Sequence, residues 1–248
     1  MVPRAKSNCS PPFAASSSRG LKREHNEDCF GADGELSLWL VADGVGGHSH
    51  GEVASSIVKT TIRGAVAHGE DLLEAICSAH SAVLEEIARR KASSGMGSTV
   101  VAMTLEGESY DIVWVGDSRA YLWDGEKLSQ LSRDHRHVSS LVAQGLITRE
   151  EAKNHPERNL LTQSIGVSAN TQIHPDRERG VIKPGQQIIL CSDGLSDELS
   201  DEEIATQMCD HDSAQGQVDG LMQAALTAGG SDNITVIVVG SPPPGANP

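Results

Sequence analysis

The stretch LWLVADGVGG, from Leu38 to Gly47, organises the sequence. It begins as an unbroken apolar run, which is the pattern of a buried strand. Asp43 ends the run, and the glycines after it predict a tight turn. Because glycine has no Cβ, the backbone beside this carboxylate can come very close to a ligand. The stretch therefore predicts a strand-end site for a hard metal ion, with a plain glycine turn whose aspartate bonds its own backbone as the alternative.

Length and charge limit the class of protein. A chain of 248 residues suits one large domain or two small ones and can bury a real core. Its formal net charge is −14 and its aromatic content is 3%. Duplex nucleic acid, anionic membranes and stacked bases are therefore poor partners. No apolar run approaches the roughly 18 residues that a membrane-spanning helix needs.

The five cysteines are scattered, odd in number and without a CxxC spacing. This pattern argues against a disulfide framework and against a structural zinc site. The N-terminus carries Arg4 and Lys6 but no apolar segment, so it does not resemble a secretory signal. We therefore expect reduced cysteines in a cytoplasmic protein.

Hydrophobic periodicity predicts a mixture of strands and helices. The expected strands cover residues 13–18, 28–33, 35–42, 98–105, 110–115, 119–123, 127–131, 171–179, 186–190 and 234–239. The expected helices cover residues 51–67, 71–91, 138–144, 148–154, 201–209 and 212–227. Residues 1–12 and 241–248 are polar or proline-rich and are expected to be flexible. Between these ends we expect one domain, residues 13–240. Its polar segment 136–166 is expected to form a lid-like insert or flap.

Four aspartates adjoin predicted strand ends, and three of them stand beside glycine. They are Asp43, Asp117, Asp193 and Asp232. Oxygen ligands alone favour magnesium or manganese over zinc, and the excess of carboxylates suggests two ions. Asp117, taken alone, could equally be a turn residue that caps local amides.

A charged segment near the N-terminus fits the same chemistry. Arg23 suits a phosphate group, because its guanidinium is a planar fork of donors. The adjacent Glu27 and Asp28 suit a divalent cation, directly or through water. The alternative is an ordinary solvated charged loop.

The ordered motifs resemble the metal-dependent protein phosphatase family, of the protein phosphatase 2C type, and most closely its bacterial stand-alone members. The matching motifs are RxxNED at 23–28, DGVGG at 43–47, GST at 97–99, GDSR at 116–119, SDG at 192–194 and SDN at 231–233. The resemblance covers about residues 13 to 240. It implies an α+β fold with a central antiparallel β-sandwich flanked by helices on both faces, in four layers ordered α-β-β-α.

The resemblance also implies roles for individual residues. Asp43 would bridge two Mn²⁺ or Mg²⁺ ions, the Gly44 carbonyl would bind one of them, and Asp193 and Asp232 would complete the other. Glu27 and Asp28 would hold metal-bound waters or act from the second layer of ligands. Asp117, with Asp193, would match a third, weaker ion site. Arg23 would clamp the phosphate.

The implied reaction is hydrolysis of phosphoserine and phosphothreonine in proteins by a hydroxide between the two ions. Val45 departs from the many eukaryotic relatives that carry a histidine, proposed as the general acid, after the Asp-Gly pair. Valine cannot donate a proton, so we expect a metal-bound water to protonate the leaving oxygen.

The implied partners are phosphoprotein substrates and a separately encoded serine/threonine kinase, which this signalling enzyme would oppose. We expect a cytoplasmic monomer that binds neither nucleic acid nor membrane. Two other functions stay open at this point. One is a catalytically degenerate module that binds phosphoproteins, and the other is a hydrolase of small phosphate esters.

Overall fold

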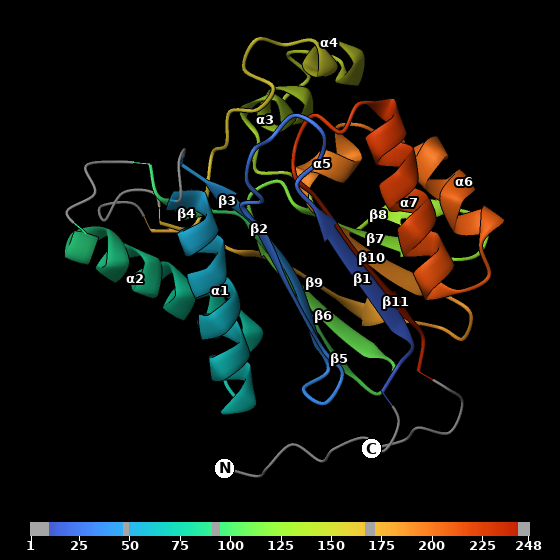
Figure 1. Ribbon diagram of the computed structural model, residues 1–248, viewed down its shortest axis with the longest axis horizontal. Helices are drawn as coiled ribbons and strands as arrows, with labels where there is room; N and C mark the ends of the chain where they lie inside the picture. The colour runs from blue at the N-terminus through green and yellow to red at the C-terminus, as the bar shows by residue number, and fades with distance from the viewer. Residues whose placement is uncertain (1–9, 47–49, 91–94, 167–171, 243–248) are drawn as a thin grey trace.

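The computed structural model describes residues 10–46, 50–90, 95–166 and 172–242. Most of the two expected flexible ends lies outside these ranges, as do Gly47 of the glycine run and Thr171 of an expected strand. Figure 1 shows two β-sheets facing each other between two groups of helices. Both sheets are built from antiparallel neighbours.

The first sheet has the strand order β1-β11-β10-β7-β8. Its strands are β1 (Phe13–Ser18), β7 (Arg119–Trp123), β8 (Leu128–Gln130), β10 (Gln187–Cys191) and β11 (Ile234–Gly240). The second sheet has the order β2-β3-β5-β6-β9, with β4 paired to β3 beside this path. Its strands are β2 (Asp28–Asp33), β3 (Leu38–Val45), β4 (Gly97–Ser98), β5 (Val100–Glu106), β6 (Ser109–Val115) and β9 (Asp176–Val181).

Helices cover the outer face of each sheet. The long helices α1 (His50–Ala67) and α2 (Leu72–Arg90) pack on the second sheet, and α1 also contacts β2, β3 and β4. On the first sheet lie α5 (Asp193–Ser196), α6 (Asp201–Asp210) and α7 (Ala214–Ala228). The insert carries α3 (His137–Ala143) and α4 (Arg149–Lys153) and stands at one end of the sandwich in Figure 1.

Three apolar cores hold the layers together. One lies between α1, α2 and the second sheet and includes Ile62 and Ile76. Another lies between the first sheet and α6 and α7 and includes Leu221. The third fills the space between the sheets and includes Trp39 and Ile188. Strand residues alternate between two of these cores, as the period of a strand requires. The expected four-layer α-β-β-α fold is confirmed (Figure 1).

The organising stretch differs from the sequence expectation at its end. The strand does not stop at residue 42; β3 continues through Asp43 to Val45. It continues because β4 offers it a partner, with Gly44 opposite Ser98 and Val45 opposite Gly97. Asp43 therefore lies within a paired strand, which fixes its backbone more firmly than a free turn would.

Two further details differ from the expectation. The single strand expected at 98–105 is divided at Thr99 into β4 and β5. Asp193, expected beside a strand end, follows β10 by two residues and is also the first residue of the short helix α5. In the insert, Thr148 and Glu151 form a capping box at the start of α4. Within the described ranges, no helix has the length and apolar character needed to cross a bilayer.

Candidate metal centre

Two carboxylates face each other across the β2–β3 pair. Asp28 is the direct partner of Asp43 in the antiparallel register. Directly opposite side chains on neighbouring strands share one face and lie roughly 5 Å apart at Cβ. Like charges in this arrangement repel each other. The sheet therefore holds two acids together that would separate if they were free to do so.

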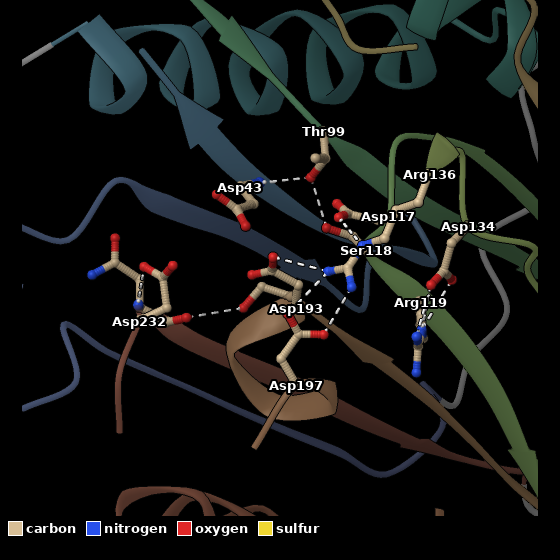
Figure 2. A network of polar contacts seen from close by, with 12 residues as sticks. Asp43, Thr99, Asp117, Ser118, Arg119, Asp134, Arg136, Asp193, Asp197 and Asp232 are labelled. Atoms are coloured by element: carbon tan, nitrogen blue, oxygen red, sulfur yellow. Dashed lines mark hydrogen bonds and ion pairs between the residues drawn. The ribbon is translucent and has the colours of Figure 1, made fainter. Parts of the chain in front are cut away.

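Hydrogen bonds fix the backbone of Asp43 on both sides. Its N–H donates to Thr99 Oγ1 at 3.1 Å, and its carbonyl accepts from the N–H of Thr99 at 2.8 Å. The Ser98 hydroxyl donates to the same carbonyl at 3.0 Å. Thr99 Oγ1 also lies 2.7 Å from the hydroxyl of Ser118, next to Asp117 (Figure 2). The GST motif at 97–99 thus positions Asp43 relative to Asp117.

Asp28 is buried, with 9% of its surface exposed, and connects the two sheets. Its Oδ2 accepts hydrogen bonds from Ser192 Oγ at 2.8 Å and from Thr235 Oγ1 at 2.7 Å. Its Oδ1 is buried and has no hydrogen-bond partner. Burial raises the pKa of Asp28 to about 6, against the lowering effect of the two hydroxyl donors.

Asp193 and Asp232 come from the first sheet. Asp193 follows β10 and opens α5, and Asp232 precedes β11, the neighbour of β10. A Cβ on Gly194 would lie 1.9 Å from the carbonyl oxygen of Asn233, so only glycine lets these two loops touch. This close approach places the two aspartates side by side at one end of the sheet (Figure 2).

Asn233 attaches the charged N-terminal segment to the same place. Its side-chain amide donates to the carbonyls of Arg19 at 3.0 Å and His25 at 2.8 Å. Its Oδ1 accepts from the N–H of Glu27 at 2.7 Å. The RxxNED segment is therefore held against the Asp232 loop by one buried side chain.

Arg23 is exposed and forms an ion pair with Asp232, with Nη2 2.6 Å from Oδ2. The hydrogen bond to Asp232 raises the pKa of Arg23. Burial is the largest cause of a raised pKa at Glu27, a half-buried residue of the same segment. Both side chains thus lie at the centre, as the sequence predicts, but Arg23 binds a carboxylate in this structure.

Gly44 lies where the end of β3 meets the first turn of α1. A Cβ at this position would lie 2.2 Å from the carbonyl oxygen of Gly51 and 2.7 Å from that of Glu27. The N–H of Gly44 donates to the Glu27 carbonyl at 3.2 Å. The glycine after Asp43 is therefore required by contact between three backbone segments and not by a turn.

Asp117 is buried between the sheets and is paired with an arginine that the sequence did not single out. Nε of Arg136 donates to Asp117 Oδ2 at 2.6 Å. The same guanidinium donates to Asp193 Oδ2 at 3.1 Å and to both oxygens of Asp197, at 2.9 and 3.2 Å (Figure 2). The structure thus brings Asp117 together with Asp193, as expected, and places Arg136 between them.

The concentration of acids changes their ionisation. The pKa of Asp43 is raised well above its usual value, first by burial and then by the charges of Asp28, Asp193 and Asp117. The pKa of Asp193 is raised in the same way, first by burial and then by Asp117 and Asp197, and Arg136 opposes this. The raised pKa values of Asp43 and Asp193 indicate that the site holds more negative charge than its arginines neutralise.

The donor chemistry fits hard divalent cations. All the candidate ligands are oxygen atoms, and Asp28 Oδ1 is a buried acceptor without a donor. Within the described residues, no three acidic, histidine or cysteine side chains already surround one point. Arg23 and Arg136 account for this physically, because each holds acids of the cluster in its own hydrogen bonds. Binding of a cation through Asp232 Oδ2 would displace Arg23 from that oxygen, whereas Arg136 engages only Oδ2 of Asp193.

Several residues of the centre were not assigned a role from the sequence. Thr99 and Asn233 belong to recognised motifs, yet their positioning roles follow only from contacts between distant segments. Arg136 and Asp197 carry no motif signal, because the spacing of 61 residues between them says nothing of their contact. A buried arginine can be found only once the carboxylates that it neutralises are known to surround it.

The sequence comparisons point to one family. The family model described as protein phosphatase 2C matches residues 18–228. The serine/threonine protein phosphatase PstP of Mycobacterium tuberculosis is 37% identical over 236 residues, which are 91% of this chain and 44% of PstP. A putative protein phosphatase 2C-type of Streptococcus pyogenes is 34% identical over 232 residues, 89% of this chain and 93% of that protein. The chain thus spans less than half of PstP but nearly all of the streptococcal protein.

A solved structure agrees with this grouping. The catalytic domain of PstP, crystallised in complex with two manganese ions, is similar with a TM-score of 0.82 and 34% identity. The match covers 94% of this chain and 99% of that one. At 34% sequence identity, the similarity between the two chains goes beyond a shared fold.

Proposed function

This chain belongs to the protein phosphatase 2C family, and from that membership we propose that it hydrolyses phosphoserine and phosphothreonine in proteins with two Mn²⁺ or Mg²⁺ ions. The observation that carries the proposal is the facing pair Asp28 and Asp43, joined by Asp193 from the other sheet. A pure binding module has no need of buried acids that repel one another.

Asp43, Asp193, Asp232 and the carbonyl of Gly44 would hold the two ions. Glu27 and Asp28 would hold water around them, because Asp28 keeps one oxygen free and Glu27 directly precedes it, held against the Asp232 loop by Asn233. When bound, the ions would lower the pKa of a water molecule, so that it can attack the phosphorus as hydroxide at neutral pH, and they would offset the negative charge of the phosphoryl oxygens. The PstP structure with two manganese ions supports this stoichiometry.

The residues of the chain then position the substrate. For Asp232 to act as a ligand, its carboxylate must leave Arg23, and this frees the guanidinium to bind a phosphate dianion in its place. Arg23 is 55% exposed, so a phosphorylated side chain on another protein can reach it. Val45 has no proton to give, so the leaving oxygen takes its proton from water.

The finer expectations follow as part of the same proposal. Residues 13–240 form one catalytic domain, and the insert 136–166 is a flap whose base contacts the centre through Arg136. The odd number of scattered cysteines, without a CxxC spacing, supports a reducing compartment such as the cytoplasm. There the protein opposes a serine/threonine kinase and acts as a monomer.

Hydrolysis assays test the proposal. With Mn²⁺, we expect release of phosphate from para-nitrophenyl phosphate and from phosphoserine and phosphothreonine peptides, with EDTA abolishing it. Asp193→Asn should lower kcat by at least about 100-fold, because the metal affinity is lost. Asp124→Asn, in the exposed β7–β8 turn, is the matched control and should retain activity. Phosphopeptide binding without turnover would establish a degenerate binder, and a preference for nucleotides over phosphopeptides would establish a small-ester hydrolase.

A further inference from the structure

The guanidinium of Arg136 lies among three carboxylates at the base of the insert. It donates to Asp117 through Nε, to Asp193 through Nη2 and to Asp197 through both terminal nitrogens, with distances from 2.6 to 3.2 Å. Its side chain is 8% exposed, and that of Asp117 is 5% exposed. Figure 2 shows the guanidinium between Asp117 and Asp193. It therefore neutralises acids that come from two different sheets.

The backbone holds Arg136 in this place from both sides. Arg136 caps the start of α3 in an extended conformation and forms an isolated β-bridge with Leu161. The preceding residue, His135, donates its N–H to the Gly116 carbonyl at 2.9 Å, beside Asp117. The following N–H, of His137, donates to the Leu160 carbonyl at 2.8 Å. The chain thus delivers the side chain into the acidic cluster from a fixed base.

A cation that used both Asp117 and Asp193 as ligands would compete for these bonds. Arg136 already engages Oδ2 of each carboxylate. A guanidinium in a protein does not deprotonate, so a change of pH cannot remove its charge. Displacing the guanidinium would also break its ion pair with Asp197. The positive charge of Arg136 would then stay in the interior without a carboxylate beside it, which is strongly unfavourable.

We propose that Arg136 is a built-in cation that takes the position between Asp117 and Asp193, so that this chain binds two metal ions and excludes a third from that position. This inference rests on the proposed two-ion centre and revises the sequence expectation that Asp117 ligates a further ion. Arg136 is a positioning residue, because it orients Asp193 for the main centre through Nη2.

Manganese uptake tests the proposal without reference to turnover. Chelator-treated protein is titrated with MnCl₂ in a calorimeter, and crystals soaked in MnCl₂ are examined by anomalous diffraction. We expect two ions in the wild-type protein, with no manganese peak between Asp117 and Asp193. Arg136→Ser should gain a third ion at that position, and the double variant Arg136→Ser, Asp117→Asn should lose it again.

Arg177→Ser is the matched control. Arg177 also bridges two carboxylates, Asp111 and Asp71, but it lies on the edge strand β9 outside the centre. Its loss should leave the manganese count unchanged.

Two results would overturn the role of Arg136. One is a third ion beside Asp117 in the wild-type protein, which decides the question even if Arg136→Ser does not fold. The other is a folded Arg136→Ser protein that still binds two ions. A wild-type protein that takes up no manganese would instead remove the two-ion centre itself, so the two failures can be told apart.

Discussion

Replacing Asp28 with asparagine should stabilise the metal-free protein at neutral and alkaline pH. The carboxyl of Asp28 is buried, and its pKa rises from the ordinary 3.8 to about 6. A shift of this size means that ionising Asp28 in the folded state costs about 3 kcal/mol. Asparagine has no such cost. Its carbonyl can still accept from Ser192 and Thr235, and its amide can donate toward Asp43, its cross-strand partner.

The pH range follows from the direction of the shift. Because the folded pKa of Asp28 is raised, the folded protein holds a proton that the unfolded chain has already lost between pH 3.8 and about 6. The stability linked to that proton is fully present below the pKa of Asp28 in the unfolded chain. It disappears as the pH rises through the pKa of Asp28 in the folded protein. The difference between Asp28→Asn and wild type should therefore be small near pH 4 and reach about 3 kcal/mol above pH 7.

Urea unfolding in EDTA at a series of pH values measures this difference. At pH 8, the melting temperature of Asp28→Asn should also exceed that of wild type by roughly 6 to 12 °C. Asp124→Asn is the control of opposite sign, because hydrogen bonds from the backbone N–H groups of Lys127 and Glu126 lower the pKa of Asp124. It should weaken the fold slightly at pH 8 and not at low pH. An Asp28→Asn protein that is no more stable than wild type at pH 8 would refute the account of the site as a strained cluster of acids.

Three other predictions concern the same centre. Arg23→Ala removes the group that would clamp phosphate, and should raise KM by about 10-fold or more while lowering kcat less, in steady-state assays with a phosphopeptide; an unchanged KM would contradict the clamp. Gly194→Ala would force a Cβ to within 1.9 Å of the Asn233 carbonyl oxygen, so urea unfolding should show a loss of several kcal/mol, about the size of a severe core defect; a stability equal to wild type would contradict the close contact. Addition of saturating Mn²⁺ at pH 6 should release more protons from the chelated wild-type protein than from chelated Asp28→Asn, because a carboxyl with a pKa of about 6 is partly protonated at that pH; calorimetry in buffers of different ionisation enthalpy measures this, and equal release by the two proteins would contradict it.

The strand-end aspartates could be found from the sequence because their signal is local. An apolar run that stops at an aspartate beside glycine predicts both the strand and the carboxylate at its end, as at Asp43 and Asp193. The order of these segments, compared with a known family, then gave the sandwich and its four layers. The exact end of β3 could not be predicted, because it depends on the two-residue partner strand β4.

The contacts that tune the centre could not be predicted in the same way. Arg136 lies in a polar insert where charged residues are common, and an arginine among them is ordinarily exposed. Its burial depends on three carboxylates from β6–β7, α5 and the residue after α5 meeting at one point. These carboxylates come together only when the two sheets have assembled, so the sequence pattern of the insert cannot predict that Arg136 is buried among them.

The glycines of the motifs connect the chemistry of the site with the stability of the fold. Gly44 touches Gly51 and Glu27, and Gly194 touches Asn233, so each glycine lets a segment that carries an acid approach another such segment. Close packing of backbone thus buries the carboxylates beside one another, and burial, followed by their mutual repulsion, raises their pKa values. The carboxylates cannot move apart without breaking those contacts. A divalent cation relieves the repulsion that packing has imposed, and it binds most strongly where that repulsion is greatest. Glycine at these positions therefore supports metal affinity through the backbone contacts it permits, even though it contributes no side chain to the metal.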